Sequence, residues 1–279
     1  MTSTPIPLPT QGALTEAQSV EAKRTRIILV GLGGATCSGK TTLAKHLRSI
    51  LPDSFIIHQD DFAPHSSTLP IHPTLGQDWD SAPTAIDYPR LRSFLATVKL
   101  TASVPADHKS HDHLNEQKQF EVSGEMRQKW KKLFAELHEK VAKSSGDKGV
   151  GEKVVWGLVD GFLLYWDDEV AASLDAKFFL RVPYAALKTR RENRSGYYTA
   201  ENTFWKDPPG YFDELVYPAY VDAHKKIFEN GDVEHGKAIM PGLQLIEPLG
   251  RDMGDIVEEC CRSLVGLLES VAPQPDVAS

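Results

Sequence analysis

The chain has 279 residues, of which 41% are hydrophobic and 25% are charged. This composition is ordinary for a globular protein that buries a core, and it excludes a fully disordered chain. The net charge of −7 and the sequence pI near 5.8 disfavour a protein that coats nucleic acid, because that role needs a basic surface. Three cysteines, with Cys260 and Cys261 adjacent, do not make a disulfide framework and favour a reducing compartment.

The two ends of the sequence carry no pattern of regular structure. Residues 1–24 contain several prolines and no sustained apolar period, so we expect a flexible tail there and a second one at 273–279. No secretory signal is visible, and apolar runs such as 27–32 are too short to span a bilayer. We therefore expect a cytoplasmic protein, or a nuclear one, with its domain at 25–272 and no membrane partner.

Short apolar runs and helical spacings alternate along this domain. Helical periodicity predicts helices over 40–51 and 253–271, and Cys260 falls on the apolar stripe of the second. The alternation predicts an α/β fold with a parallel sheet and helices on both faces. The runs typical of buried strands are residues 27–32, 55–57, 154–159, 178–182 and 243–246.

The stretch 101–152 departs from this alternation, and we interpret it as a partly helical insertion. Apolar residues spaced through 126–137 indicate a helix, and 144–151 is typical of a flexible connector. The histidines of this stretch lack accompanying cysteines and a regular spacing, so we favour a solvated loop over a metal site. They are His108, His111 and His113.

Residues 34–41 read Gly-Ala-Thr-Cys-Ser-Gly-Lys-Thr and match the phosphate-binding pattern G-x-x-x-x-G-K-[ST] at every fixed position. The match follows a predicted buried strand and opens a predicted helix, as the mechanism requires. Glycines allow a tight turn whose N–H groups point at phosphate oxygens, and the helix N-terminus favours anions. We expect Lys40 to reach the β- and γ-phosphates and the Thr41 hydroxyl to ligate Mg²⁺.

Carboxylates follow two of the predicted strands. Asp160 directly follows the run 154–159, and we expect it to contact the metal directly or through water, although such a residue can also cap a turn. Asp60 and Asp61 follow the run 55–57. Ligands of doubly wound sheets bind at the carboxyl ends of strands, so one of these two acids can accept the proton of an attacking hydroxyl. Adjacent side chains diverge, so at most one of them reaches that hydroxyl.

Three arginines follow the strand 178–182. The spacing of Arg190 and Arg194 predicts one face of one helix, with Arg191 beside them. Such a basic helix can form a lid over the transferring phosphoryl group, and the alternative is a solvated helix. The chain contains no N-K-x-D tetrapeptide, which argues against a GTPase.

Together these motifs resemble the fungal nicotinamide riboside kinases, within the uridine-kinase-like group of P-loop kinases. The resemblance covers the chain except for the N-terminal tail and the central insertion. It implies a P-loop kinase-type parallel sheet with helices on both faces. The segment Asp-Pro-Pro-Gly-Tyr-Phe-Asp at 207–213 is more specific than the P-loop. The matching blocks are residues 34–42, 58–62, 78–83, 159–164, 183–197, 204–220 and 230–234.

The resemblance implies that ATP and Mg²⁺ phosphorylate the ribose 5′-hydroxyl of nicotinamide riboside, giving nicotinamide mononucleotide for NAD salvage, with nicotinic acid riboside as a further candidate substrate. It implies Asp60 as proton acceptor, helped by Lys40 and Arg190, and a Mg²⁺ environment of Thr41, Asp60 and Asp160. Aromatic faces at Trp79 and Tyr197 would attract the pyridinium cation. The nucleotide contacts it implies are Gly34, Ala35, Thr36, Cys37, Ser38, Gly39, Lys40, Thr41, Thr42, Arg190, Arg194, Tyr197 and Asp252. The nucleoside contacts it implies are Asp60, Asp61, Phe62, Trp79, Asp80, Arg191, Tyr197 and Tyr198.

Two alternatives stay open at this point. One is a uridine/cytidine-type kinase of the same fold, and the other is a nucleotide-binding regulator that has lost catalysis. The complete set of Lys40, Thr41, Asp60 and the arginines argues against the second.

Overall fold

The computed structural model describes residues 24–115, 120–143, 152–199 and 201–271. The predicted tail at 1–24, apart from its last residue, the predicted tail at 273–279 and the predicted connector at 144–151 lie outside the described residues. No helix of the described part is both long and apolar enough to cross a membrane.

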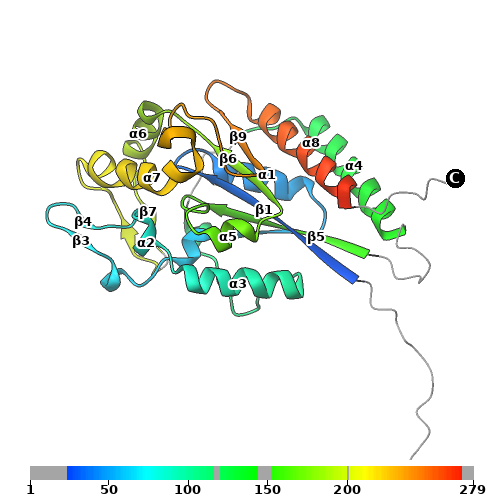
Figure 1. The fold of residues 1–279 in the computed structure, drawn as a ribbon, viewed down its shortest axis with the longest axis horizontal. Coiled ribbons are helices and arrows are strands. Elements are labelled where there is room, and N and C mark those ends of the chain that lie inside the picture. Colours follow the sequence, from blue (N-terminus) through cyan, green and yellow to red (C-terminus); the bar gives the residue numbers. More distant parts are fainter. Residues whose placement is uncertain (1–23, 116–119, 144–151, 200, 272–279) are drawn as a thin grey trace, which may run out of the picture.

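A five-stranded parallel sheet forms the centre of the molecule, as predicted (Figure 1). Its order is β2-β5-β1-β6-β9, so the first strand lies in the middle and the chain winds outward to both edges. All five predicted runs fall within these strands or overlap them. The strands are β1 Arg24–Gly34, β2 Ser54–His58, β5 Glu152–Gly161, β6 Ala176–Leu180 and β9 Leu243–Ile246.

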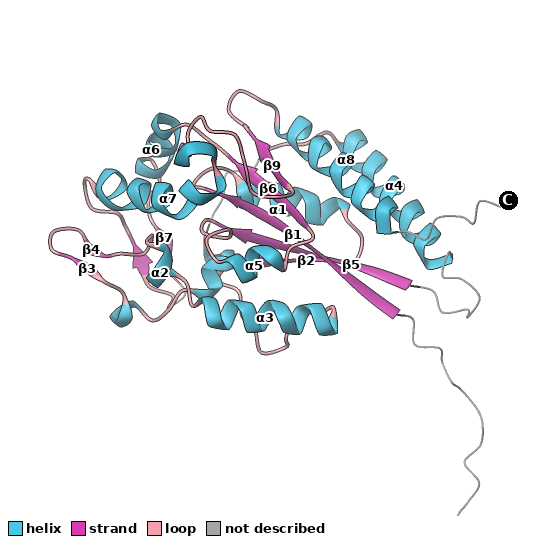
Figure 2. Cartoon of the chain, in the orientation of Figure 1, coloured by secondary structure: helices cyan, strands magenta, loops and turns pink. Residues whose placement is uncertain are grey.

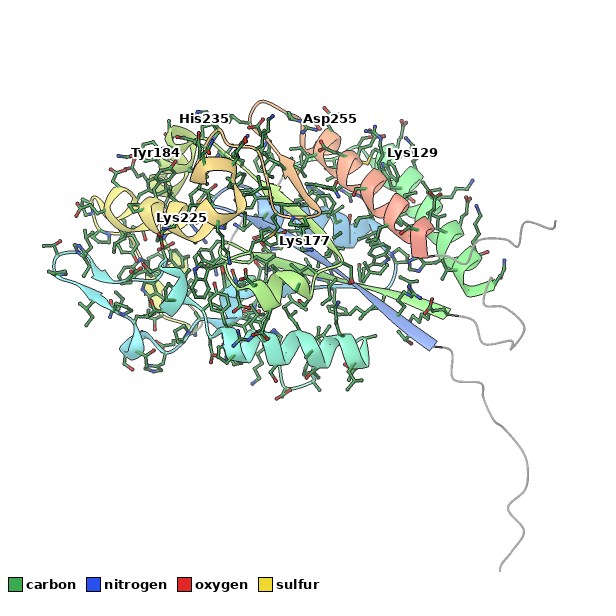
Figure 3. The ribbon with its side chains drawn as sticks, in the orientation of Figure 1. Lys129, Lys177, Tyr184, Lys225, His235 and Asp255 are labelled. Carbon is green, nitrogen blue, oxygen red and sulfur yellow. The ribbon has the colours of Figure 1, made fainter. Side chains whose placement is uncertain are left out.

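Helices cover both faces of this sheet (Figure 2). One face carries α1 (Lys40–Ile50), α4 (Gly124–Lys143) and α8 (Met253–Val271), which contact one another. The helices against the other face are α2 Ala82–Ala85, α3 Tyr88–Thr101, α5 Asp168–Ala172, α6 Tyr184–Glu192 and α7 Tyr217–His224. Polar residues such as Lys129 of α4 and Asp255 of α8 lie on the outer surfaces of these helices, and Lys225 lies exposed directly after α7 (Figure 3).

The central strand explains why both faces are apolar. Ile28, Val30 and Leu32 of β1 pack against the α1/α4/α8 layer, whereas Leu29 packs into the opposite core. Successive side chains of a strand point to opposite faces, so a strand covered on both faces is apolar throughout. The continuous apolar run in the sequence follows from this double burial.

Two small antiparallel hairpins and several single turns complete the fold, and none of them was predicted. The hairpins join β3 (Ile71–His72) to β4 (Gly76–Gln77) and β7 (Tyr197–Tyr198) to β8 (Phe204–Trp205). Strands of two residues are too short for alternation to reveal them. The turns are η1 Gln59–Phe62, η2 Ser66–Thr68, η3 Asp112–Leu114, η4 Phe212–Val216 (a π-turn), η5 Lys225–Ile227 and η6 Glu229–Gly231.

Helix α4 contains the predicted helix 126–137 and is part of the core. Phe134 is fully buried, and its ring centroid lies 5.8 Å from that of Trp156 in β5 and 6.3 Å from that of Trp130. Much of the apolar surface of α1 and α8 is therefore covered by this segment.

We expect Phe134→Ala to lower the free energy of unfolding by about 3–5 kcal/mol, because it removes a buried ring and leaves a cavity. Lys131→Ala, on the exposed side of the same helix, is the control and should change it by less than about 0.5 kcal/mol. Urea unfolding of the two variants measures both values. Equal effects would show that α4 is not part of the core.

Candidate active site

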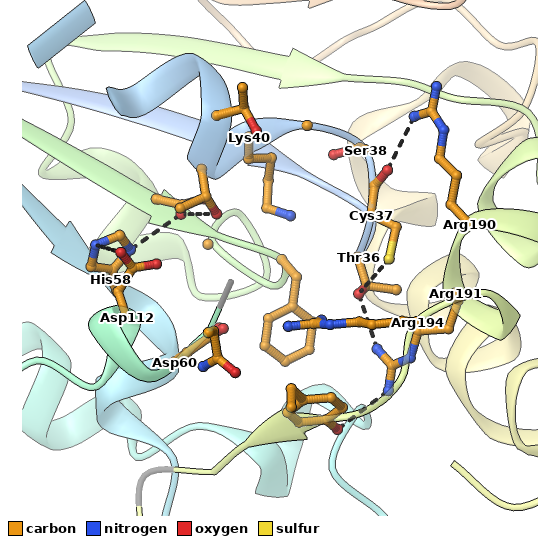
Figure 4. Close-up of a pocket in the computed structure, with 18 of the residues that line it drawn as sticks. Thr36, Cys37, Ser38, Lys40, His58, Asp60, Asp112, Arg190, Arg191 and Arg194 are labelled. Atoms are coloured by element: carbon orange, nitrogen blue, oxygen red, sulfur yellow. Dashed lines mark hydrogen bonds and ion pairs between the residues drawn. The ribbon is translucent and has the colours of Figure 1, made fainter. Parts of the chain in front are cut away.

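A cavity of about 1030 Å³ opens at the carboxyl ends of β1, β2 and β5 (Figure 4). This volume is at the upper end of the range for small-molecule sites and suits two ligands side by side. The predicted residues that line it are Thr36, Cys37, Ser38, Gly39, Lys40, Thr41, Thr42, Asp60, Asp61, Trp79, Asp80, Asp160, Arg190, Arg191, Arg194, Tyr197 and Tyr198. The predicted residues that do not line it are Gly34, Ala35, Phe62 and Asp252.

The loop between β1 and α1 adopts the backbone of a phosphate-binding nest. Cys37 and Gly39 have positive φ angles of 59° and 103°, and α1 begins directly afterwards at Lys40. The Lys40 ammonium donates to the Ala35 carbonyl at 2.9 Å and is thereby held within the loop. Because the backbone turns with these positive angles at a helix N-terminus, the loop offers N–H groups and a positive dipole end to an anion.

Gly34 is the last residue of β1 and begins the turn into this loop. Its φ is +134°, and a Cβ on it would lie 2.4 Å from the Leu180 carbonyl oxygen of β6. Only glycine allows both the angle and the close approach. Gly34 therefore shapes the loop without lining the cavity.

Asp160 lies at the end of β5, beside the P-loop helix. The Thr41 hydroxyl donates to Asp160 Oδ2 at 2.5 Å, and His58 Nδ1 lies 3.3 Å from the same oxygen. The other oxygen, Oδ1, is buried and has no hydrogen-bond partner in the part of the chain that the structure describes. Burial would raise the pKa of Asp160, but the hydrogen bond from His58 and the charge of Lys40 outweigh it and lower that pKa. Asp160 is therefore an anion with one oxygen free.

This arrangement fits a magnesium ion. Hard oxygen ligands suit Mg²⁺, and a buried carboxylate oxygen without a partner is otherwise costly. Thr41 and Asp160 supply a hydroxyl and a carboxylate at one point of the cavity wall. These two residues would hold the ion.

Asp60 lies in η1, directly after β2, with its carboxylate accessible from the cavity (Figure 4). No side chain among the described residues is hydrogen-bonded to this carboxylate. Desolvation by the surrounding cavity wall raises the pKa of Asp60, the negative charge of Asp160 adds to the rise, and Lys40 opposes it. A carboxylate with a raised pKa that lines the same cavity as the P-loop suits the role of a proton acceptor.

Asp61 points away from Asp60, toward the loop after α3. Its Oδ1 accepts from the His111 backbone N–H at 2.9 Å, and its Oδ2 lies 3.4 Å from His108 Nε2. His108 also stacks on the buried Phe62 at 5.6 Å. The expectation of a solvated histidine loop is therefore wrong for His108 and His111, because the buried Asp61 holds them against the core.

The basic segment after β6 is only partly helical. Helix α6 ends at Glu192, and Arg194 lies beyond it, so the prediction that Arg190 and Arg194 share one helix face is wrong. The chain turns at 193–196, where Gly196 has a φ of +134° that a helix cannot contain. Arg190 Nη1 donates to the Cys37 carbonyl at 3.1 Å, and the Arg194 guanidinium lies 4.8 Å from the Tyr197 ring centroid. Both arginines still line the cavity.

Arg191 is buried and joins the P-loop to the block that follows β8. Its guanidinium donates twice to Asp207, at 2.6 and 3.1 Å, and once to Thr36 Oγ1 at 3.0 Å. It lies 3.7 Å from Asp80 and 5.2 Å from the Tyr197 ring centroid. A bidentate pair of this kind fixes the geometry of both partners.

Asp80 and Trp79 also line the cavity. Asp80 is buried, and its Oδ2, 3.7 Å from Arg191 Nη2, accepts no hydrogen bond from the described residues. The indole N–H of Trp79 likewise has no hydrogen-bond partner among them. Desolvation raises the pKa of Asp80 to about 6, and Arg191 opposes the rise. The Trp79 ring packs edge-on against Trp205, with ring centroids 6.1 Å apart. These free polar atoms are positioned to contact a ligand.

The remaining predicted residues lie at the margins. Tyr198 is 40% exposed and packs against Phe204. Asp252 accepts from the Gly254 N–H at 2.7 Å at the start of α8, while its neighbours Arg251 and Met253 line the cavity.

Sequence reasoning missed His58, Asp112, Asn115 and Asp207 as parts of this site. Asp112 pairs with Lys45 of α1 at 2.7 Å, and Asn115 exchanges two hydrogen bonds with the Tyr198 backbone. His58 and Asp207 carried usable signals, since His58 directly follows the predicted strand 55–57 and Asp207 opens the specific segment 207–213. Asp112 and Asn115 depend on contacts between segments far apart in the chain.

We expect Asp80→Asn to stabilise the protein above pH 6 and not below pH 4. The pKa of this carboxyl is about 6 in the folded protein and 3.8 ordinarily, so the unfolded chain releases the proton first as pH rises. The free energy of unfolding of the wild-type protein therefore falls by roughly 3 kcal/mol between pH 4 and pH 7. The Asp80→Asn variant does not undergo this loss, because asparagine does not titrate.

Thermal melts of both proteins from pH 4 to pH 8 measure this difference, with Asp222→Asn on the exposed side of α7 as the matched control. The melting temperature of Asp80→Asn should exceed that of the wild-type protein by several degrees at pH 7.5. A difference that does not change with pH would contradict the assignment.

Comparison with curated proteins finds nicotinamide riboside kinases. The chain is 35% identical to the enzyme of Eremothecium gossypii over 221 residues, which cover 78% of this chain and 84% of that protein. It is 35% identical to the Saccharomyces cerevisiae enzyme (75% and 82% covered) and 31% identical to the Schizosaccharomyces pombe enzyme (88% and 99% covered). No protein-family model matches the chain.

Among solved structures, a sugar kinase from Janibacter sp. HTCC2649 matches with 14% identity and a TM-score of 0.37, covering 90% of this chain and 99% of that chain. That likeness is too distant to carry an argument. The fungal relatives, matched over more than four fifths of their own length, show that the chain belongs to the nicotinamide riboside kinase family.

Proposed function

We propose that this enzyme transfers the γ-phosphoryl group of ATP to the ribose 5′-hydroxyl of nicotinamide riboside, giving nicotinamide mononucleotide for NAD salvage in the cytoplasm. Membership of the nicotinamide riboside kinase family supports nicotinamide riboside as the substrate. The observation that carries the reaction is the free Asp60 carboxylate, which shares one cavity with the P-loop. No feature of the cavity, as the described residues form it, favours a second function.

The P-loop would bind the triphosphate. Residues 36–42 line the cavity and would offer backbone N–H groups to the phosphates, and the Lys40 ammonium would move from the Ala35 carbonyl to them. Arg190, now on the Cys37 carbonyl, and Arg194 lie where they would meet the charge of the transferring group. The loop before α8, which includes Arg251, would flank the adenine.

Thr41 and Asp160 would hold Mg²⁺, with Asp60 nearby. When bound, the ion neutralises phosphate charge and orients the transferring group. The unpartnered Asp160 Oδ1 supports this assignment.

Asp60 would take the proton of the 5′-hydroxyl as that oxygen attacks phosphorus. Desolvation raises the pKa of Asp60 above its ordinary value and so makes its carboxylate a stronger base. Asp61 would help to hold Asp60 in place. Its own carboxylate is anchored by the His111 backbone N–H and by the imidazole of His108.

Asp80 and Trp79 would bind the nucleoside. Oδ2 of Asp80, which lies 3.7 Å from Arg191 Nη2 without a hydrogen bond, could accept one from a ribose hydroxyl while Arg191 keeps the carboxylate in place. The pyridinium cation gains about 0.5–2 kcal/mol over a desolvated aromatic face. Trp79 is favoured for this contact, because the Tyr197 ring already has two guanidinium groups within 5.2 Å. Tyr198 and Phe62 would act only at the edge of the site.

The activity is tested with purified protein, ATP, Mg²⁺ and a panel of nicotinamide riboside, nicotinic acid riboside, uridine and cytidine. We expect nicotinamide mononucleotide as product and the highest kcat/KM for nicotinamide riboside, since neutral pyrimidines gain no cation–π contact. Lys40→Ala is the inactive control. A higher kcat/KM for uridine would favour the pyrimidine kinase, and nucleotide binding without turnover would favour a regulator.

We expect Asp60→Asn to lower kcat at least 10²-fold while the Kd for ATP stays within threefold, because only proton transfer is removed. Asp61→Asn should lower kcat less than tenfold, since its carboxylate contacts the histidine loop. Steady-state kinetics and nucleotide titration measure both variants. Unchanged turnover in Asp60→Asn would show that another group takes the proton.

A further inference from the structure

We propose that His58 is a positioning residue that fixes the Asp160 carboxylate in the orientation required for Mg²⁺. The inference rests on the metal assignment of the proposed function and adds the residue that prepares that carboxylate. His58 lines the same cavity but does not itself reach into the P-loop (Figure 4).

The sheet itself brings the two side chains together. His58 of β2 and Asp160 of β5 are direct partners in the parallel register, so both side chains leave the sheet on the same face and at its carboxyl edge. His58 Nδ1 lies 3.3 Å from Asp160 Oδ2, and both side chains are largely buried, at 11% and 6% exposed. The contact is therefore built on rigid strands and not on a loop.

The hydrogen bonds of Asp160 are distributed unequally between its oxygens. Oδ2 accepts hydrogen bonds from the Thr41 hydroxyl and the His58 N–H, whereas Oδ1 is buried and accepts none from any described residue. Two donors on one oxygen fix the rotation of the carboxylate about its Cβ–Cγ bond. Oδ1 is thereby kept free for the metal or for a water molecule on it, which is how outer contacts of a metal ligand act.

The imidazole is held on its other side as well. His58 Nε2 lies 3.9 Å from the Asp112 carboxylate, which pairs with Lys45 of α1 at 2.7 Å. This contact places Nδ1, and not Nε2, against Asp160. A chain of polar contacts thus runs from α1 through Asp112 and His58 to Asp160.

The geometry distinguishes two substitutions of similar size. In His58→Asn the side-chain amide places a donor where Nδ1 stands, so the bond to Asp160 is retained. His58→Leu fills the same space without a donor. Loss of an outer contact of a metal ligand lowers metal affinity about 10–100-fold.

The test measures Mn²⁺ binding by electron paramagnetic resonance in the presence of a non-hydrolysable ATP analogue, without nucleoside and without turnover. We expect His58→Leu to raise the Kd for Mn²⁺ at least tenfold and His58→Asn to stay within threefold of wild type. The KM for Mg²⁺ in the kinase assay should rise with His58→Leu, while kcat at saturating Mg²⁺ stays within threefold. His65→Leu, whose imidazole contacts Glu201 outside the cavity, is the matched control.

Thermal melts establish that each variant is folded, and His58→Ala provides a second variant without the donor. Equal Mn²⁺ affinity in wild type, His58→Leu and His58→Ala would overturn this inference alone. Equal loss in His58→Asn and His58→Leu would also overturn it, because the Nδ1 donor would then not be the cause. Failure of the wild-type protein to bind Mn²⁺ would overturn the metal assignment and this inference together.

Discussion

The parallel register of β1, β5 and β2 is the constraint on which the site depends. Leu32 pairs with Asp160, and Asp160 pairs with His58, so the three strands end at one edge of the sheet. The chain leaves β1 into the P-loop and leaves β2 into η1, which carries Asp60. The P-loop, the Asp160 carboxylate that we propose holds Mg²⁺ and the proposed proton acceptor Asp60 therefore meet without any long loop having to hold them.

Around this edge the protein buries charges that a purely structural core would avoid. Asp80, Asp160 and Arg191 are each at most 6% exposed, and one oxygen each of Asp80 and Asp160 has no hydrogen-bond partner among the residues described. Burying a polar atom without a partner costs about 1–3 kcal/mol. The Arg191–Asp207 pair offsets part of this cost, and a bound ligand would supply the missing partners. These oxygens are the atoms that we propose contact the nucleoside and the metal ion.

The sequence was informative where the signal is local. The P-loop at 34–41 and the strand that precedes it are contiguous, and Asp160 ends an apolar run, so both could be placed at the edge of the sheet from spacing alone. Arg194 was misplaced because a turn near Gly196 ends the helix early, which its charge pattern does not reveal. His108 was misplaced because its partner, Asp61, lies far away in the chain and becomes buried only when the fold forms.

The central claim is that one cavity aligns a nucleoside hydroxyl between Asp60 and the P-loop. The most direct measurement is a crystal structure with a non-hydrolysable ATP analogue, Mg²⁺ and nicotinamide riboside. We predict the ribose 5′-oxygen about 2.6–3.2 Å from an Asp60 carboxylate oxygen and facing the γ-phosphate held by 35–41. A nucleoside bound elsewhere, or an Asp60 carboxylate turned away from the 5′-oxygen in the ternary complex, would contradict the account.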